Sequence, residues 1–340
     1  MKTLEPPKMF NASLKTQIRK YQEYANEIQE ELKKAPFEWG RYQSVFNQEV
    51  NMVFYRIMEF ERDQMKQGKE ESVYKMKKLF LKHLQKDFLR GDYIRWSLEK
   101  PYGYAGDFKI IDDIYRNAPR TEGFDRLFDN YFMMSSISVA VRNRKEDFKN
   151  QILESIRMKK NQGVAIMDLA CGPCEEVVDI FTSSEKLDLS RVAYHCYDSD
   201  ERAIEFSKNR LEGIPQIKFF KENAVRLALK KDIGAFIPHR YDVIYSTGLF
   251  DYFDYRICVR LVQNLKKLLN PGGLLAISDV RDKFSNPSVH FMEWVGDWNL
   301  VYRDDESFRQ VFREAGFIKE NLKIGYEQQG ILQYIYARNS

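Results

Sequence analysis

The sequence has few histidines and few cysteines. It contains four of each among 340 residues, and the histidines are scattered at His83, His195, His239 and His290. They do not pair with cysteines or carboxylates at the spacing of metal-ligand motifs, so we expect no metal site. The cysteines lack the spacing of a disulfide scaffold, and this favours a reducing compartment.

Long hydrophobic runs and a dominant charge are also missing. No window reaches the roughly 18 uncharged apolar residues of a membrane-spanning helix, and the first residues lack the apolar stretch of a secretory signal. We therefore expect a cytoplasmic protein without a membrane span. The 54 basic and 50 acidic side chains leave a net charge of only +4. Because these charges are interleaved, they argue against a nucleic-acid or membrane surface.

What is present is ordinary globular material, with 44% hydrophobic and 31% charged residues and enough length for two domains. From Asn11 to about Leu89, apolar residues recur at spacings of three and four. This period predicts helices over 11–34, 38–67 and 70–90, interrupted near Pro36 and Gly68. We expect a helical cap or substrate domain over residues 1–130 and an α/β domain over 131–340.

The stretch from Lys100 to Tyr115 reads KPYGYAGDFKIIDDIY. Loops with such chemistry often carry function. Tyr102 and Tyr104 could donate hydrogen bonds to a substrate oxygen, while the neighbouring glycines allow tight turns. An aromatic-anchored turn between helices is the alternative interpretation.

The run GVAIMDLACGPCEEVVDIF, residues 163–181, has the pattern of a buried strand, a turn of small residues and an amphipathic helix. Asp168 ends the strand. Ala170, Cys171 and Gly172 let a ligand approach the backbone, and the N–H groups of the following helix point outward. The sequence therefore predicts a cradle of the nucleotide-binding type.

The letters CGPC, residues 171–174, also match the redox motif of thioredoxin-like proteins. The regular alternation of strands and helices that follows favours a doubly wound sheet instead. In that context DLACGP resembles motif I of class I S-adenosylmethionine-dependent methyltransferases, whose usual form is D/E-x-G-x-G-x-G. Ala170 and Cys174 depart from the first and third glycines.

The units downstream fit this resemblance. A strand over 191–197 ends in Asp198, whose carboxylate can accept both hydroxyls of a ribose, while Asp200 suits the cap of the next helix. After a short strand over 217–220, Asn223 could bond an adenine amino group or cap a helix. Arg142 and Arg144 lie before the first strand, where a guanidinium could pair with the cofactor's carboxylate or simply lie on a surface.

The last strands would complete the sheet. A strand over 241–246 is followed by the ligand-binding edge at 247–252. NPGG, residues 270–273, reads as a turn into a strand over 274–278, and runs at 318–326 and 331–337 read as an antiparallel pair. Trp294, Trp298, Tyr302 and Arg303 precede that pair and suggest an apolar channel with a cation for an acid head group, or the edge of a core helix.

PYGYAGDF and GLFDYF are similar to segments of a bacterial methyltransferase family that makes 3-hydroxypalmitic acid methyl ester, an extracellular signalling lipid. This resemblance covers about Lys100 to the C-terminus. It implies an α/β, Rossmann-like class I methyltransferase sheet of seven strands with an antiparallel last strand, an N-terminal helical domain, and S-adenosylmethionine as cofactor. The expected cofactor-binding residues are Arg142, Asp168, Ala170, Cys171, Gly172, Asp198, Ser199, Asn223, Ala224, Thr247 and Gly248. The expected substrate-binding or catalytic residues are Tyr102, Tyr104, Asp107, Asp251, Tyr252 and Arg303.

The function that follows is methyl transfer to a small-molecule acceptor, with the carboxylate of a (hydroxy) fatty acid as the expected acceptor. A carboxylate, with a pKa of about 4, needs no general base at neutral pH. Asp107 or Asp251 would serve as base for a hydroxyl or amine acceptor. The alternatives are N- or hydroxyl O-methylation of a polar small molecule, a non-catalytic module that binds the cofactor, and a thiol oxidoreductase. The oligomeric state stays open.

Overall fold

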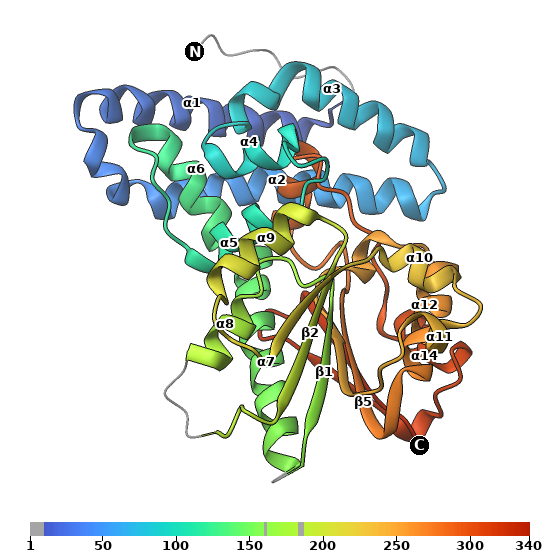
Figure 1. The fold of residues 1–340 in the computed structure, drawn as a ribbon. Coiled ribbons are helices and arrows are strands. Elements are labelled where there is room, and N and C mark those ends of the chain that lie inside the picture. Colours follow the sequence, from blue (N-terminus) through green and yellow to red (C-terminus); the bar gives the residue numbers. More distant parts are fainter. Residues whose placement is uncertain (1–9, 160–161, 183–186) are drawn as a thin grey trace. The chain divides into compact units, whose positions relative to one another are not determined.

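The computed structural model describes residues 10–159, 162–182 and 187–340 (Figure 1). Residues 1–9, part of the stretch judged to lack a secretory signal, lie outside the described residues. The chain divides into two compact units, one of residues up to 139 together with 283–299, and one of 140–282 together with 300–340. The expected division at residue 130 stays a prediction. Within the described ranges, every helix is too short or too polar to cross a bilayer.

The first unit is helical. The predicted helices over 11–34, 38–67 and 70–90 are present within a few residues, with a 3-10 turn before the second, and the stretch after Lys100 forms a turn and then a helix. Burial follows the apolar stripe, since Phe46, Val50, Val53 and Phe54 are fully buried along one helix. The elements are α1 Ala12–Lys34, η1 Pro36–Arg41, α2 Gln43–Lys66, α3 Glu70–Phe88, α4 Asp92–Glu99, α5 Phe108–Arg116, α6 Gly123–Met134 and α13 Pro287–Val295.

Aromatic rings form the core of this unit. Phe54 of α2 makes edge contacts with Phe80 and Phe88 of α3, at centroid distances of 5.9 and 5.2 Å, and with Phe291 of α13 at 5.3 Å. Such edge-to-face arrangements match the quadrupoles of the rings. Residues 283–299 therefore belong to the helical core although they follow a strand of the other unit.

The second unit is built on a seven-stranded sheet of order β3-β2-β1-β4-β5-β7-β6. The first five strands are parallel, and β7 runs antiparallel to both β5 and β6. The prediction of a Rossmann-like α/β sheet of seven strands, with an antiparallel last strand and an N-terminal helical region, is confirmed. The strands are β1 Val164–Leu169, β2 Val192–Asp198, β3 Ile217–Lys221, β4 Tyr241–Ser246, β5 Leu269–Val280, β6 Leu322–Tyr326 and β7 Leu332–Arg338.

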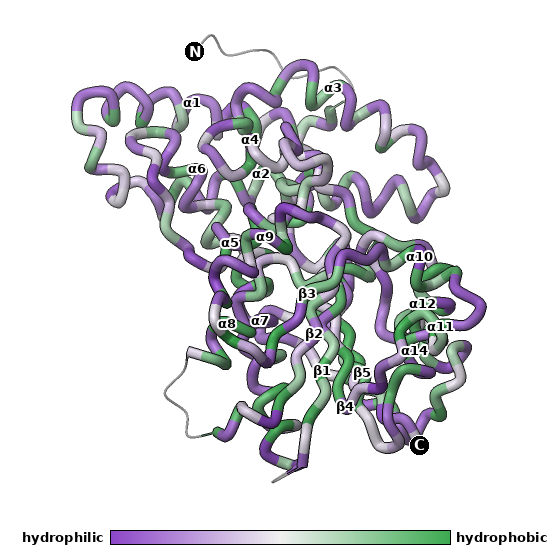
Figure 2. Tube along the Cα trace, in the orientation of Figure 1, coloured by the Kyte–Doolittle hydropathy of each residue, from purple (hydrophilic) through white to green (hydrophobic). Residues whose placement is uncertain are grey.

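Helices cover both faces of the sheet (Figure 1). One face carries a buried apolar cluster that includes Met167, Ile244 and Leu275, and green runs along these strands in Figure 2. The other face carries Asp168 and Tyr245, against which Phe148 packs. On the first face lie α10 Ala224–Leu229, α11 Ile233–Phe236, α12 Tyr255–Lys267 and α14 Asp305–Glu314; on the second lie α7 Ser136–Met158, α8 Glu175–Thr182 and α9 Glu201–Arg210.

Two predicted boundaries are wrong. The NPGG stretch is part of β5, because Leu269 pairs with Tyr241 and the N–H of Gly272 donates to the carbonyl of Asn339 at 2.7 Å. The register shift between Tyr241 and Val243 absorbs the extra residues. The start of the run at 318–326 is a 3-10 turn, η3 Lys319–Asn321, so β6 begins at Leu322.

Gly91 supplies a test of the packing in the helical unit. Its φ is +81°, and an added Cβ would lie 2.4 Å from Oδ1 of Asp129, which accepts the N–H of Asp92 at the start of α4. We expect Gly91→Ala to displace this cap and to lower the free energy of unfolding by roughly 3 kcal/mol. Gly68→Ala, at φ +67° with no atom within 4 Å, should cost only the left-handed strain of about 1 kcal/mol. Chemical denaturation measures both, and equal losses would contradict the role of Asp129.

Candidate cofactor site

The turn after β1 has a left-handed backbone at three alternate positions. The φ angles are +60° at Ala170, +53° at Gly172 and +52° at Cys174. These are the three glycine positions of the resembled motif, and two of them carry a side chain. A non-glycine residue in this region costs roughly 1–2 kcal/mol. The backbone of this turn thus keeps the left-handed conformation that glycine favours, although two of the three positions are not glycine. This conformation lets a ligand approach the backbone of the turn closely.

The carboxylate of Asp198 fixes this turn to the end of β2. It accepts the N–H of Gly172 at one oxygen and the N–H of Asp200 at the other, both at 2.9 Å. The N–H of Cys171 donates to the carbonyl of Tyr197 at 3.1 Å. Each oxygen of a carboxylate can accept further bonds, so Asp198 keeps capacity for a ligand. Asp200 caps α9 by accepting the N–H of Arg202, as the sequence predicts.

Asp168 is 1% exposed, and its Oδ2 has no hydrogen-bond partner among the described residues. Burial, followed by the charges of Glu176 and Cys174, raises its pKa well above the ordinary value. Glu176 is also buried and accepts a hydrogen bond from the hydroxyl of Tyr245 at 2.9 Å. Burial, then the charge of Cys174, raises the pKa of Glu176 to about 7. Two carboxyl groups thus share a water-excluded site behind the turn.

Arg144 on α7 reaches the end of β4. Its Nη1 lies 3.0 Å from the position of a Cβ at Gly248, which has a φ of +85°. The side chain is 4% exposed, and its Nε has no hydrogen-bond partner in the described part of the chain. Arg142 is half-buried, and burial lowers its pKa. From the sequence we expected Arg142 to bind the cofactor's carboxylate, whereas the position of Arg144 beside Gly248 favours Arg144 for this role.

The other expected cofactor residues surround the same edge. Asn223 caps α10, because its Oδ1 accepts the N–H groups of Val225 at 2.9 Å and Arg226 at 3.2 Å. The capping interpretation is therefore correct for this oxygen. Ala224 is buried, while Ser199 is exposed. Their contacts with a ligand stay predictions, as does that of Thr247, which is half-buried after β4.

Arg303 and Asp251 belong to a buried polar cluster at the ends of β4 and β5. The guanidinium of Arg303 is bonded to Asp279 at 3.0 Å and to two backbone carbonyls of the segment after β4. Burial raises the pKa of Asp251, and the N–H of Val280 donates to it. Burial, then the charge of Asp251, raises the pKa of Asp279 well above its ordinary value. These contacts make Arg303 a clamp on the chain, unlike the open cation expected for an acid head group.

Tyr102, Tyr104 and Asp107 lie in the first unit. Asp107 is fully buried and caps α5, accepting the N–H groups of Lys109 and Ile110 and the indole N–H of Trp96. These three donors occupy both of its oxygens, which favours a cap over a general base. Tyr102 stacks on Phe108 at 5.4 Å, so its ring anchors the turn. Tyr104 is 38% exposed.

Three ligand-type side chains meet behind the turn in a way that the sequence analysis missed. One ligand atom each from Asp168, Cys171 and Cys174 lies within 4.8 Å of the others, and all three residues are buried. Burial raises the pKa of Cys174, but hydrogen bonds from Cys171, Cys196 and Ser207 outweigh it and lower the pKa well below its ordinary value. The sequence analysis considered the two cysteines as a redox pair and did not add Asp168 to them, because this residue lies three positions before Cys171 and belongs to the strand.

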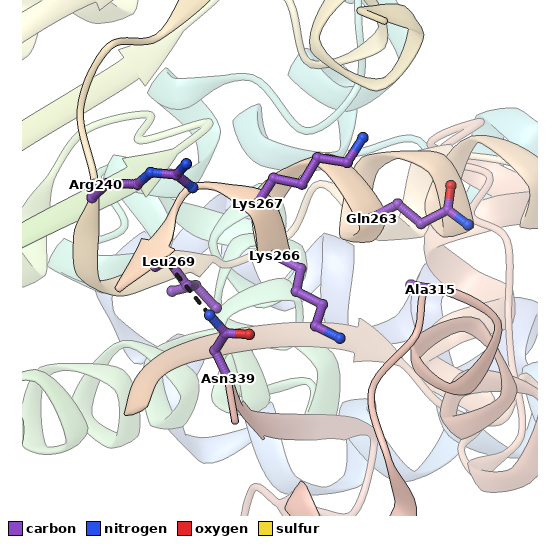
Figure 3. A pocket seen from close by; sticks show the side chains of 7 residues that line it. All are labelled: Arg240, Gln263, Lys266, Lys267, Leu269, Ala315 and Asn339. Atoms are coloured by element: carbon purple, nitrogen blue, oxygen red, sulfur yellow. Dashed lines mark hydrogen bonds between the residues drawn. The ribbon is translucent and has the colours of Figure 1, made fainter. Parts of the chain in front are cut away.

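A hollow of about 470 Å³ lies at the opposite edge of the sheet, where β4 and β5 begin (Figure 3). Its three cations face no carboxylate within the lining. The amide of Asn339 donates to the carbonyl of Leu269 across it, and Lys266 donates to the carbonyl of Gly316. Because Asp168 and Asp198 end their strands at the other edge, this hollow is separate from the candidate site. Its lining comprises Arg240, Gln263, Lys266, Lys267, Leu269, Ala315 and Asn339.

The raised pKa of Glu176 has a consequence for stability. From its ordinary 4.5 to about 7, the folded chain holds a proton that the unfolded chain has lost, so unfolding becomes easier as pH rises through this window. We expect Glu176→Gln, which can still accept from Tyr245, to raise stability by up to roughly 3 kcal/mol at pH 8 and to change little at pH 4. Thermal denaturation at both pH values measures this. A stabilisation equal at both would contradict the buried proton.

Comparison with known proteins finds one family model and several solved structures that are similar to this chain. Residues 167–275 match the model of a family described as methyltransferase domain, and no curated protein matches the chain. A possible exported protein from Bordetella parapertussis is 19% identical with a TM-score of 0.53, over 68% of this chain and 79% of that one. The magnesium protoporphyrin IX methyltransferase of Synechocystis PCC 6803 with bound SAM is 11% identical, with a TM-score of 0.46, over 73% and 98%. The CMeT domain of the citrinin polyketide synthase is 17% identical, with a TM-score of 0.49, over 73% and 60%. Residues 167–275 are thus similar to a methyltransferase domain, and the likeness to the Bordetella protein shows a shared fold.

Proposed function

We propose that this protein is an S-adenosylmethionine-dependent O-methyltransferase that acts on the carboxylate of a small-molecule acid. One observation carries the cofactor part. Near the ends of β1 and β4, a buried carboxylate oxygen on Asp168 and a buried guanidinium nitrogen on Arg144 both lack a hydrogen-bond partner among the residues that the structure describes. Buried polar groups without partners are costly. The amino-acid end of the cofactor carries an ammonium and a carboxylate, which complement this pair.

The residues fit the cofactor along its length. Asp168 would accept the ammonium, and its raised pKa would fall as the cation binds. Arg144 would hold the carboxylate beside Gly248, where an added Cβ would lie only 3.0 Å from the guanidinium. Asp198 keeps lone pairs for the ribose hydroxyls. The capping bonds of Asn223 use its oxygen, so its amide N–H₂ would donate to a ring nitrogen of the adenine.

The cofactor supplies an electrophilic methyl group on a sulfonium, and the protein must align the acceptor and exclude water. The two candidate bases argue for an acceptor that needs no deprotonation. Asp107 is a helix cap with three donors, and Asp251 is buried and bonded to the backbone of Val280. His195 is bonded to Tyr241, and burial lowers its pKa to about 4. A carboxylate acceptor is already ionised at neutral pH.

Positioning of the acceptor falls to groups at the open edge. Tyr252 follows β4 in the short helix η2 Phe250–Tyr252 and is 39% exposed. Its phenol could donate to one carboxylate oxygen while the other attacks the methyl group. Tyr102 and Tyr104 are proposed to act on the substrate from the turn after Lys100. The resemblance to enzymes of fatty-acid methyl ester synthesis supports a long-chain hydroxy acid as the substrate.

The two arginines of α7 can be compared directly. Arg144→Lys keeps a positive charge and removes the forked donor, so we expect S-adenosylhomocysteine to bind about ten-fold more weakly. Arg142→Lys should leave the affinity within about two-fold, because an exchange away from the ligand costs only a few tenths of a kcal/mol. Isothermal titration calorimetry of both variants measures this. The reverse ranking would restore Arg142 as the cofactor's partner.

Turnover identifies the acceptor. We expect the protein, incubated with methyl-labelled cofactor and long-chain 3-hydroxy acids, to form labelled products that mild base hydrolyses, because methyl esters are base-labile and methyl ethers and amines are stable. Label that survives base would move the assignment to hydroxyl O- or N-methylation. Cofactor binding without labelling of any acid, alcohol or amine would favour a non-catalytic module. Retained labelling after replacing Cys171 and Cys174 by serine would exclude the thiol oxidoreductase.

A further inference from the structure

We propose that Asp168, Cys171 and Cys174 form a binding site for one thiophilic divalent cation, with Zn²⁺ as its best-fitting occupant. Their ligand atoms lie within 4.8 Å of one another and all three residues are buried. Tetrahedral zinc has Zn–S distances of about 2.3 Å and Zn–O distances of about 2.0–2.2 Å. The ligand atoms would therefore need to move closer by about 1 Å or less, which a change of side-chain torsion supplies.

The chemistry of the donors selects the kind of metal. Two sulfurs and one carboxylate oxygen suit a borderline-soft ion and suit Mg²⁺ or Ca²⁺ poorly, since those prefer six or more oxygen ligands. Binding needs both sulfurs as thiolates and Asp168 as a carboxylate, so it releases the protons that these three groups still hold. A third thiol, that of Cys196, lies opposite Asp168 on β2 and is fully buried. Three protein ligands leave a coordination position open, as in sites that exchange their fourth ligand.

A second observation points to a ligand at this place. Oδ2 of Asp168 is buried without a hydrogen-bond partner among the described residues. A cation would satisfy this oxygen as well as an ammonium would. The guanidinium of Arg210 bonds the carbonyl of Pro173 at 3.2 Å and pairs with Glu175 at 2.5 Å. Because Glu175 already balances this guanidinium, a site with two thiolates, one carboxylate and a divalent ion would keep a single net negative charge.

The site overlaps the proposed seat of the cofactor's ammonium, because Asp168 belongs to both. Metal and cofactor should therefore exclude each other. This competition rests on the proposed function, whereas metal binding itself does not. By linkage, a metal that weakens the cofactor's affinity has its own affinity weakened by the same factor.

The experiment uses the full chain, stripped of metal with a chelator and kept reduced. Titration with Co²⁺ should produce the thiolate-to-cobalt charge-transfer absorbance at one ion per chain, and Zn²⁺ should abolish it. Cys174→Gly removes one sulfur at a position whose φ of +52° suits glycine, so the absorbance should be lost while S-adenosylhomocysteine still binds. Cys258→Ser, a buried cysteine of α12, is the matched control and should keep the absorbance.

The outcomes separate the two proposals. Absence of the charge-transfer band in the unaltered protein, or its persistence in Cys174→Gly, would overturn the metal site. S-adenosylhomocysteine should bind about ten-fold or more weakly to the zinc-loaded chain, and equal affinity would overturn the overlap. No binding of S-adenosylhomocysteine to the metal-free chain would refute the proposed function and leave the cobalt result intact.

Discussion

The hydrogen bond from Gly172 N–H to Asp198 holds the site together. It joins the turn after β1 to the end of β2 at 2.9 Å, and the second oxygen of the same carboxylate holds the start of α9 through Asp200. Charge-assisted bonds of this kind are about twice as strong as neutral ones. They help to maintain a left-handed backbone at Ala170 and Cys174, where side chains oppose it. Removal of the Asp198 carboxylate would therefore disturb the conformation of the turn itself, in addition to any contact with a ligand.

The strands were predictable wherever the signal was local. The apolar run at 241–246 became β4 with the predicted bounds, and the strand ending at Asp198 began one residue later than expected. Strand order depends on pairing between distant segments, which no local pattern encodes. The number of strands and the antiparallel last strand were therefore expected from the family resemblance, and the strand order was not predicted. The error at NPGG has the same origin, because Leu269 is a strand residue only through its pairing with Tyr241.

The site was predictable in its residue types and less so in its geometry. Arg142 and Arg144 are two positions apart on a helix and so point to different faces. Arg144 shares the face of Phe148, four residues on, whose ring packs on Tyr245 and Tyr334. The spacing of four residues between Arg144 and the apolar Phe148 could have indicated that Arg144, rather than Arg142, faces the sheet. Glu176 has the sequence context of a solvated first-turn acid, and only the packing of α8 on the sheet buries it.

The two faces of the sheet differ in their contribution to stability and to ligand binding. One face, with Met167, Ile244 and Leu275, supplies hydrophobic stabilisation, while the face of Asp168 and Glu176 opposes it by holding protonated acids in a dry site. A ligand with a cationic end lowers the energy of that second face, and it thereby adds stability to the folded chain by mass action. Because water is excluded from this site, the buried carboxylate oxygen would favour any cation that reaches it, whatever its chemical type. An ammonium and a soft metal ion both satisfy the buried oxygen, and only the nearby thiols favour the metal.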